Sequence, residues 1–310
     1  MNKTLRIIFI ILLSMLAVGI GIVFVKLLTG NGFLNFSFNR FESKELVIEE
    51  VYDNIFENIN INSEEGNIYI EQSNDDKIKV VVYDKKEISE VKVENDTLVI
   101  KGDTDKCSFI CFNHKIARIE VYIPSNFDKN IKIEGDTSDT IMNDFEYASI
   151  EITDKTGDVT IGKIKDVNIK TSTGDIRINN AEKAKIKTTT GDIRLKEVND
   201  AELNTTTGDI NITTVNNADL STTTGDIDID KVNNSIHAST TTGDITINEL
   251  ELTENSKIDA TTGDITIRNT NEIYIDASSS TGDIHINNNY RTAEFELRIK
   301  TSTGDIKVKN

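Results

Sequence analysis

The chain has 310 residues, a formal net charge of −18 and an isoelectric point of about 4.6. Such an acidic chain is a poor partner for nucleic acid or anionic lipid headgroups, because like charges repel one another. Two cysteines exclude a disulfide-dense scaffold. A hydrophobic content of 37%, with one proline and no tryptophan, favours a narrow core filled by one layer of side chains.

The N-terminus predicts a transmembrane anchor. From Ile7 to Val25 the only clearly polar residue is Ser14, and this apolar run is long enough to cross a bilayer. A cleaved signal peptide is the alternative, but the run exceeds the usual apolar length and no small-x-small cleavage pattern follows it. We therefore expect one uncleaved transmembrane α-helix over residues 7–28.

The charges around the apolar run predict its orientation. Lys3, Arg6 and the terminal amine precede it, whereas Lys26 alone follows closely. By the positive-inside rule, residues 1–6 stay in the cytoplasm and the C-terminal part of the chain is extracellular. We therefore expect a single-pass protein of the cell membrane, with residues 29–45 as a juxtamembrane linker.

Residues 46–155 predict an irregular β region. Short apolar runs alternate with polar intervals, as in Leu46–Val51, Ile78–Tyr83 and Ile116–Ile123. Ser63–Ile70 is a degenerate copy of a motif that recurs in the second half of the chain. We expect this region to be continuous with that half and to cover its first edge, as stacked repeats require.

Cys107 and Cys111 lie close together within this region. Residues four apart on one extended strand are too distant to bridge, so a disulfide requires a tight turn over Ser108–Ile110. An exported location favours oxidation. Two unpaired thiols are an alternative, and a metal site with His114 is another, although it is one ligand short for zinc.

The phrase Thr-Gly-Asp followed by an apolar residue occurs nine times in the second half of the chain. Its glycines are Gly157, Gly174, Gly191, Gly208, Gly225, Gly243, Gly263, Gly282 and Gly304. The successive spacings are 17, 17, 17, 17, 18, 20, 19 and 22 residues. Periods of about this length are typical of stacked repeats.

Each repeat offers two short strands and two corners. Apolar residues stand one and three positions after the Asp, which is the period of a strand with one buried face. A helix-turn-helix repeat is excluded, because Thr-Thr-Thr-Gly-Asp is a poor helix sequence. Identical residues are expected where coils stack about 4.8 Å apart. Residues 156–310 therefore predict an all-β fold, a single-stranded parallel β-helix (β-solenoid) with 17–22-residue coils.

The alternation within each repeat assigns residues to the inside or the outside. If the residue after each Asp points inward, two threonine columns are expected inside the coil. One contains Thr171, Thr188, Thr205 and Thr222, and the other contains Thr173, Thr190, Thr207 and Thr224. Their hydroxyls can bond one another along the stack while their methyls pack. The glycine supplies a backbone conformation with positive φ at the corner.

The aspartates of the nine motifs are expected to form an outward column. Its members are Asp158, Asp175, Asp192, Asp209, Asp226, Asp244, Asp264, Asp283 and Asp305. Carboxylates about 4.8 Å apart repel by roughly 0.9 kcal/mol even in water. In one interpretation each Asp accepts hydrogen bonds from backbone N–H groups at its own corner. In the other the column is a row of Ca²⁺ sites, although the paired glycines and nine-residue period of calcium β-rolls are absent.

The C-terminal edge of the predicted stack has no evident cap. Val308 is the last inward residue, and Asn310 follows two positions later. Unpaired backbone groups at such an edge attract other strands unless charged side chains blunt it. We expect Lys307 and Lys309 to blunt this edge, and end-to-end self-association is the alternative.

The sequence does not favour an enzyme. It has three histidines and shows no nucleophile elbow, phosphate loop or metal signature. Polysaccharide-cleaving proteins do use carboxylate clusters. An active site, however, interrupts a repeat, whereas the nine carboxylates follow it. We therefore expect no catalytic residue and no cofactor other than the calcium considered above.

The Thr-Thr-Gly-Asp-Ile-x-Ile motifs, with Val121–Pro124 and Gly66–Ile70 before them, resemble the bacterial putative-adhesin or toast-rack family of β-strand-repeat proteins. The resemblance covers most of residues 46–310. It implies a β-helix on the outer face of the membrane, in relatives linked to cell-envelope stress systems of Gram-positive bacteria. We therefore expect a non-enzymatic scaffold or interaction module with envelope proteins as partners. A surface adhesin for external polymers or host ligands is the alternative.

Overall fold

The computed structural model describes residues 36–43, 45–53, 56–84, 89–102, 110–287 and 289–309. Contacts divide the chain into two units, residues 1–41 with 105–116 and residues 42–104 with 117–310. The predicted cytoplasmic segment, the transmembrane helix and most of the predicted linker lie outside the described residues. Within the described ranges, no helix combines the length and the hydropathy needed to span a bilayer.

The described residues form 22 strands and no helix, so the all-β prediction is confirmed. The strands are β1 (Phe36–Glu42), β2 (Leu46–Tyr52), β3 (Asn58–Gln72), β4 (Ile78–Tyr83), β5 (Glu90–Glu94), β6 (Thr97–Gly102), β7 (Ile110–Ile123), β8 (Asn130–Thr137), β9 (Thr140–Met142), β10 (Phe145–Thr153), β11 (Val159–Lys170), β12 (Ile176–Lys187), β13 (Ile193–Thr207), β14 (Ile210–Thr224), β15 (Ile227–Thr242), β16 (Ile245–Leu250), β17 (Ser256–Thr262), β18 (Ile265–Thr270), β19 (Tyr274–Thr281), β20 (Ile284–Ile286), β21 (Glu296–Thr303) and β22 (Ile306–Val308).

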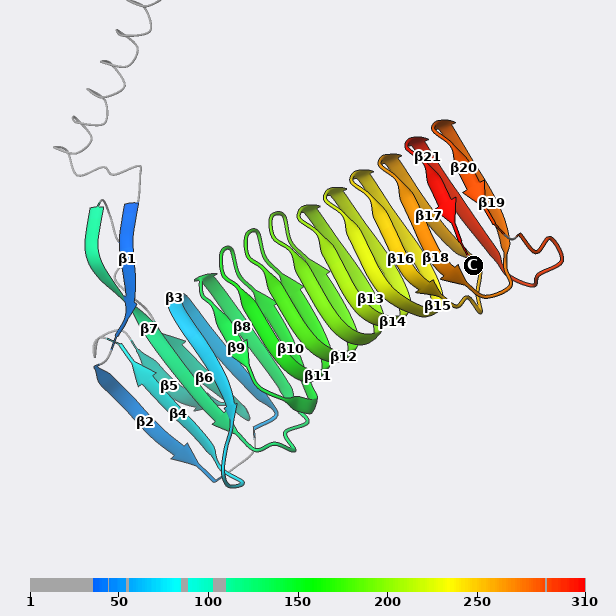
Figure 1. The fold of residues 1–310 in the computed structure, drawn as a ribbon. Helices are drawn as coiled ribbons and strands as arrows, with labels where there is room; N and C mark the ends of the chain where they lie inside the picture. The colour runs from blue at the N-terminus through cyan, green and yellow to red at the C-terminus, as the bar shows by residue number, and fades with distance from the viewer. Residues whose placement is uncertain are drawn as a thin grey trace, which may run out of the picture. The chain divides into compact units, whose positions relative to one another are not determined.

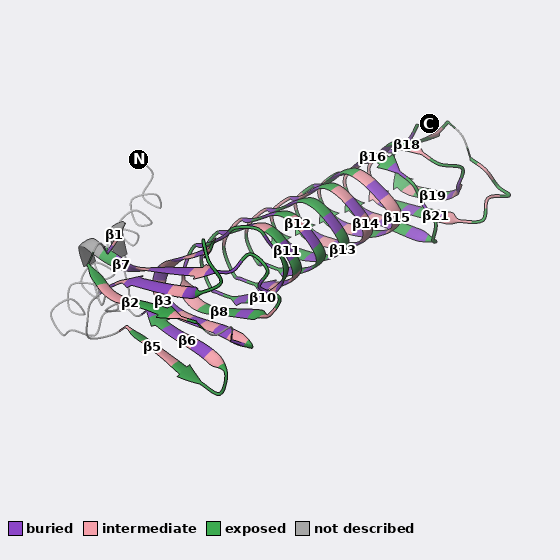
Figure 2. Cartoon of the chain, turned by 90° about the horizontal axis from the view of Figure 1, so that it is seen from below, coloured by how far each residue is buried: buried purple, intermediate pink, exposed green. Residues whose placement is uncertain are grey.

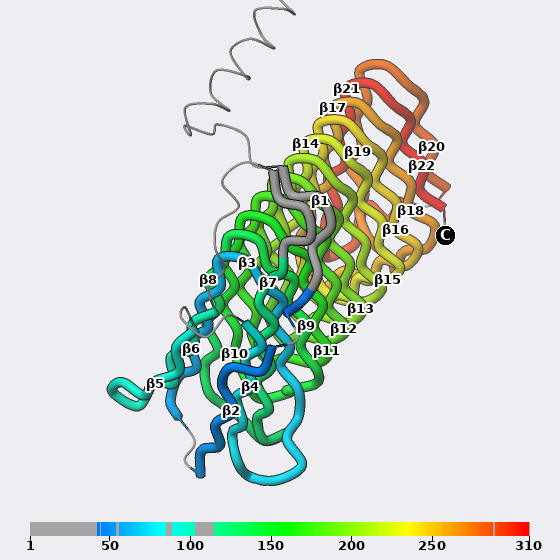
Figure 3. Tube along the Cα trace, turned by 90° about the vertical axis from the view of Figure 1, so that its left-hand side faces the viewer, coloured from blue at the N-terminus to red at the C-terminus, as the bar shows by residue number. Residues whose placement is uncertain are grey.

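The repeats stack as a β-solenoid, in the register that the sequence predicts. Strands β11 to β15 each pair in parallel with the next, and the register equals the repeat length. Ile176 lies opposite Ile193, which lies opposite Ile210. Figure 1 shows these coils side by side, and Figure 3 shows the chain passing round one coil after another. Identity from repeat to repeat therefore reflects contact between equivalent residues.

The residues after the motif aspartates form the core. Ile176, Ile193, Ile210 and Ile227 are 0% exposed, and they belong to one continuous hydrophobic cluster. Figure 2 shows buried and exposed positions alternating along the strands of successive coils. Burial of each such side chain contributes about 1.5–3 kcal/mol. The narrow core is therefore repeated in every coil.

Only one of the two predicted threonine columns lies inside. Thr171, Thr188, Thr205 and Thr222 are buried, as predicted, but Thr173 and its equivalents Thr190, Thr207 and Thr224 are exposed. Thr171 and Ile176 both point inward although they are five residues apart, so the alternation slips once between them. The slip occurs at the corner, where Gly174 has a φ of +148°. The prediction for the second column was wrong because a corner does not preserve strand alternation.

The stack extends into the region predicted to be irregular. The second half of β3 pairs with β9, and β9 pairs with β11, all in parallel. Through these pairs Ile68 is in line with Thr140, Val159 and Ile176. Ser63–Ile70 is therefore a stacked copy of the motif, as its sequence predicts.

Antiparallel strands cover the N-terminal end of this stack. β4 pairs in antiparallel fashion with β2 and with β7, and β5 pairs in the same way with β6. β6 and β7 in turn lie against β3 in parallel. The switch from parallel to antiparallel pairing ends the repeat on this side.

The C-terminal end differs from the prediction. The coil made of β21 and β22 pairs with β17 and β18 on one side and with β19 and β20 on the other. The last coil of the sequence is therefore inserted before the coil that precedes it, and Figure 1 shows β19 and β20 at the end of the stack. Lys307 consequently lies on an inserted coil and does not blunt the edge. The 22-residue spacing between Gly282 and Gly304 provides the chain length for this return.

The terminal coil is packed less completely than the others. Ile284, the residue after the motif aspartate, is 41% exposed, whereas Ile306 is 0% exposed. Asn289 protects part of this edge, because its side chain accepts a hydrogen bond from the Ile275 N–H at 2.9 Å and donates one to the Ile275 carbonyl at 2.8 Å. An asparagine side chain thus replaces one residue of a neighbouring strand.

Two truncations test the inserted coil. A chain that ends at residue 294 keeps β19 and β20 but loses their partners β21 and β22, whereas a chain that ends at residue 272 stops after a complete coil. In limited proteolysis we expect residues 273–294 of the longer variant to be cleaved at least about tenfold faster than in the full chain. The shorter variant should resist cleavage. Equal resistance of the longer variant and the full chain would contradict the inserted order.

Candidate functional site

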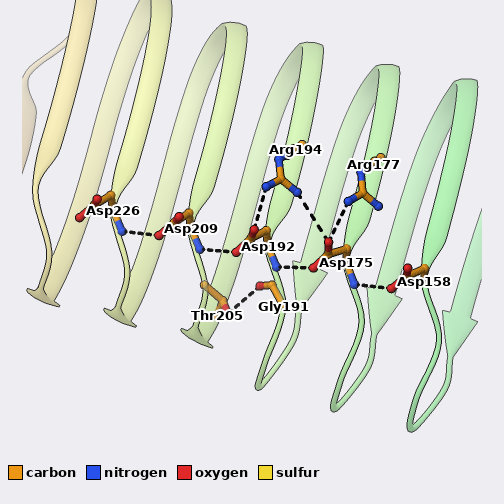
Figure 4. Close-up of polar contacts among 9 residues, drawn as sticks. All are labelled: Asp158, Asp175, Arg177, Gly191, Asp192, Arg194, Thr205, Asp209 and Asp226. Atoms are coloured by element: carbon orange, nitrogen blue, oxygen red, sulfur yellow. Dashed lines mark hydrogen bonds and ion pairs between the residues drawn. The ribbon is translucent and has the colours of Figure 1, made fainter.

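The motif aspartates form a ladder of hydrogen bonds between coils. The backbone N–H of each Asp donates to a side-chain oxygen of the Asp in the neighbouring coil (Figure 4). The N–H of Asp192 donates to Asp175 Oδ1 at 3.1 Å, and the N–H of Asp209 donates to Asp192 Oδ1 at 2.9 Å. Each Asp side chain therefore accepts a hydrogen bond from the N–H of the Asp in the next coil. The sequence had suggested N–H donors from its own corner.

The ladder includes all nine predicted aspartates. Its other donor and acceptor pairs are Asp175 to Asp158, Asp226 to Asp209, Asp244 to Asp226, Asp264 to Asp244, Asp305 to Asp264 and Asp283 to Asp305. It continues past the predicted column, since the N–H of Asp158 donates to Asp139 Oδ1 at 2.9 Å. Thr137-Ser-Asp139-Thr-Ile-Met142 is a motif copy with Ser in place of Gly, and the 19-residue spacing from Asp139 to Asp158 is the signal that could have revealed it.

The second oxygens of some of these carboxylates bind cationic side chains. Arg177 donates to Asp175 Oδ2 and Arg194 donates to Asp192 Oδ2, each at 2.8 Å, and Arg194 also lies 3.7 Å from Asp175 (Figure 4). Lys307 lies 3.0 Å from Asp305. These cations and the N–H donors offset the repulsion within the column. Calcium binding along the row stays a prediction.

The buried threonines hold the corners, but their hydroxyls do not bond one another. Thr205 Oγ1 donates to the Gly191 carbonyl at 3.3 Å (Figure 4), and Thr222 Oγ1 donates to the Gly208 carbonyl at 3.2 Å. The column expected to be linked from hydroxyl to hydroxyl is thus linked from hydroxyl to backbone. An inward hydroxyl satisfies a corner carbonyl that would otherwise lack a partner in the core.

Three of the described aspartates have a shifted pKa. Burial, followed by the neighbouring Asp226 and Asp209 carboxylates, raises the pKa of the Asp228 carboxyl. The N–H of Asp283, followed by Lys307, lowers the pKa of the Asp305 carboxyl. Burial raises the pKa of the Asp154 carboxyl to about 6, although the N–H groups of Thr156 and Lys155 act in the opposite direction. Asp305 is part of the ladder, whereas Asp154 points inward and was not singled out by the sequence.

A polar trough runs along one side of the stack, with a volume of about 870 Å³. Two rows of outward side chains form its walls, one residue per coil in each row. The first wall contains Asn58, Asn130, Ser149, Asp166, Lys183, Asp200, Asn217 and Ser235. The second wall contains Asn60, Lys132, Glu151, Asn168, Lys185, Glu202, Asp219 and His237.

The dimensions of the trough follow from the strands that build it. Each wall spans eight coils, and coils about 4.8 Å apart give a length of about 34 Å. The walls lie two residues apart on every strand, which corresponds to about 7 Å. Small inward residues, Ala184, Ala201 and Ala218, lie between the walls and keep the floor low. The trough is thus long enough and narrow enough for one extended polymer chain.

The trough walls offer hydrogen-bond donors and acceptors of both charges. Asn217 donates to Asp200 at 2.8 Å, and Lys185 lies 2.6 Å from Glu202. The Asn168 Oδ1 atom is buried and has no hydrogen-bond partner among the residues described. Carboxylates outnumber lysines, so the trough suits a neutral or cationic partner rich in hydrogen-bonding groups. The sequence did not indicate this site, because its walls vary from coil to coil.

The side chains of Cys107 and Cys111 lie outside the described residues. Cys107 lies outside the described residues, and only the backbone of Cys111 is described, in β7. A disulfide between them therefore stays a prediction. Over the part of the chain that the structure describes, no group of three or more His, Cys, Asp or Glu side chains is arranged to hold a metal ion.

Solved structures provide distant likenesses. They include a putative adhesin from Parabacteroides merdae, 13% identical over 88% of this chain and 100% of that chain, with a TM-score of 0.42. A putative lipid binding protein from Parabacteroides distasonis is 14% identical over 87% and 100% of the two chains, with a TM-score of 0.39. A putative adhesin from Bacteroides fragilis is 20% identical over the same shares, with a TM-score of 0.34.

A family profile also matches most of the chain. No relative was found among curated proteins. The profile of the Toastrack DUF4097 family, in contrast, matches residues 56–309, which include β3 and all the coils that follow it. The match includes the degenerate motif at Ser63–Ile70 together with the nine regular motifs. The chain therefore belongs to the Toastrack DUF4097 family.

Proposed function

We propose that this chain is a non-enzymatic scaffold or interaction module at the bacterial cell envelope, and that its partner lies in the polar trough. The observation that carries the proposal is the trough itself. It presents two outward side chains from each of eight coils over about 34 Å, on strands that a continuous core holds rigid. Sites on rigid elements position their groups more accurately than sites on loops.

The proposed location is outside the cell membrane. Residues 1–6 would lie in the cytoplasm, residues 7–28 would cross the membrane, and the solenoid would face outward. The 19-residue apolar run from Ile7 to Val25 and the cations before it support this arrangement. A role in an envelope stress response fits this location and the family resemblance. Other envelope proteins are the proposed partners.

The composition of the trough supports binding rather than chemistry. Asp166, Asp200 and Asp219 lie on three different coils, and Glu202 lies two residues from Asp200 on the same strand. Asp200 and Glu202 already have partners in Asn217 and Lys185, so neither is poised as a general acid or base. A surface of this kind positions a partner through many weak contacts.

Photo-crosslinking tests the proposal in cells. A photoreactive amino acid at Lys185 places the probe in the second wall, and the same amino acid at Thr206, an exposed corner residue, is the matched control. We expect adducts with envelope membrane proteins from position 185 and few or none from position 206. Equal adduct patterns from the two positions would overturn the trough as the binding surface.

The adhesin alternative is favoured by one feature, the regular spacing of trough groups about every 4.8 Å. A polymer with repeating units could lie along such a row. In that case the purified chain should bind external polysaccharides or matrix proteins, and Lys185→Glu should weaken that binding while Thr206→Glu should not. Binding to such polymers without adducts to envelope proteins would favour the adhesin over the scaffold.

A further inference from the structure

A second groove borders the aspartate ladder. Its volume is about 620 Å³, and it shares no lining residue with the trough. Two rows of outward side chains form its sides, two and four positions after the motif aspartates. The first row contains Arg177, Arg194, Asn211, Asp228 and Thr246. The second row contains Asn179, Lys196, Thr213, Asp230 and Asn248.

The charge of this groove changes sign from one half to the other. The coil that carries Arg194 and Lys196 contributes two cationic side chains. The next coil contributes only neutral side chains to the two rows. The coil after it contributes the carboxylates of Asp228 and Asp230. The neutral coil is therefore the midpoint of a pattern that is positive on one side and negative on the other.

Two charges of the groove have no opposite charge beside them. Among the residues that the structure describes, the Lys196 ammonium makes no hydrogen bond or ion pair. Asp230 Oδ1 accepts a hydrogen bond from Asn248 at 2.7 Å, but no cationic side chain in the described ranges lies within 4.0 Å of this carboxylate. Both residues are exposed. Each is thus free to pair with an opposite charge from outside the coil.

The neighbouring charges have partners but can accept more. Arg194 binds the ladder at Asp192 and Asp175, and its guanidinium has five N–H donors in all. The carboxylates of Asp226 and Asp209 help to raise the pKa of the Asp228 carboxyl, after burial. The acidic half therefore contains a surplus of negative charge that a cation from another molecule would offset.

Two copies of the groove are complementary if they meet face to face around a two-fold axis along the neutral coil. Such an axis reverses the order of the coils but keeps each row opposite the same row. Arg194 of one copy then faces Asp228 of the other, and Lys196 faces Asp230. Long cationic side chains thereby meet short carboxylates. At the axis Asn211 meets its own counterpart, and an amide can donate and accept at once.

We propose that this groove is a self-association surface, on which a second copy of the chain packs side by side and antiparallel, with Asn211 and Thr213 at the two-fold axis. The charges select the antiparallel order, because a parallel pair would place Lys196 opposite Lys196 and Asp230 opposite Asp230. Five coils about 4.8 Å apart give a contact about 19 Å long. Exposed ion pairs each contribute little, so the pair is weak and depends on concentration. It does not depend on the partner of the trough.

Charge exchange tests this surface. Sedimentation velocity of the full-length chain in detergent, at concentrations up to about 100 μM, separates monomer from dimer. We expect the wild type to dimerise, and Lys196→Glu and Asp230→Lys each to raise the dissociation constant at least about tenfold. Each single change creates two like-charge contacts by symmetry, which oppose association.

Recovery of the dimer distinguishes pairing from damage to the fold. An equimolar mixture of the two single variants places opposite charges at both contacts, so it should form heterodimers about as tight as the wild-type dimer. The variant that carries both changes should also recover. Lys187→Glu reverses an exposed charge outside both grooves and should leave dimerisation unchanged.

Three results would overturn the proposal. The first is a wild type that stays monomeric, and the second is a pair of single variants that dimerise as the wild type does. The third is a failure of the mixture and of the doubly changed variant to recover the dimer. Tighter association of Lys196→Glu with the wild type than of the wild type with itself would indicate a parallel pair and would also contradict the antiparallel order.

Discussion

Replacement of Gly208 by alanine is expected to lower the free energy of unfolding by at least about 3 kcal/mol. Gly208 has a φ of +147°, a region that is unfavourable for any residue with a Cβ atom. The added Cβ would also lie 2.1 Å from the carbonyl oxygen of Gly191 in the neighbouring coil. Backbone atoms on that side cannot move without displacing the whole coil, so the strain cannot be relieved locally.

Urea denaturation of the full-length chain, followed by far-UV circular dichroism, measures this effect. Thr206→Ala is the matched control, because Thr206 lies two residues away at the same corner and is exposed. We expect the control to change the free energy of unfolding by less than about 0.5 kcal/mol. A loss below about 1 kcal/mol in Gly208→Ala would show that neighbouring coils are not held this closely.

Asp192→Ala is expected to reduce the free energy of unfolding by about 1–3 kcal/mol. The substitution removes the acceptor of the Asp209 N–H, which lies 2.9 Å from Asp192 Oδ1, and it removes the carboxylate that pairs with Arg194. An N–H group between two stacked coils has limited access to water, so its lost hydrogen bond is only partly replaced.

Two companion variants separate the hydrogen bond from the charge. Asp192→Asn retains an acceptor oxygen and should lose less than half as much stability as Asp192→Ala. Arg194→Ala removes only exposed ion pairs, with Asp192 and Asp175, and should have an effect of about 0–1 kcal/mol. If Asp192→Asn is as unstable as Asp192→Ala, the ladder depends on charge rather than on the N–H acceptor. The same urea experiment measures all three variants.

The amino-acid sequence by itself determined the coil. Three features define which side chains face the core and which residues stack. They are the period of 17 residues, the apolar residues at alternate positions and the glycine before each Asp. Ile176 and Ile193 lie opposite one another, as their positions in the repeat require. Each of these features lies within one coil or recurs from coil to coil. The order of residues along the chain is therefore enough to reveal it.

The tertiary structure decided everything that depends on how one coil meets another. The ladder joins each Asp side chain to the N–H of the Asp in the next coil. The sequence of one corner is equally compatible with a hydrogen bond from the Asp side chain to an N–H of that same corner. The trough exists only when side chains 17 to 72 residues apart are placed in line, as Asn58 and Asn130 are. Its walls vary in residue type, so no motif marks them.

The order of the last coils shows the same limit. The sequence orders Gly282 before Gly304, but the coil of Gly304 packs against that of Gly263 and leaves the coil of Gly282 at the end. Nearly identical motifs can stack in either order, since each presents β-branched apolar residues at the same two positions and the same corner. The repeat that makes the fold predictable therefore makes the order of its units ambiguous, and only the packing of whole coils resolves it.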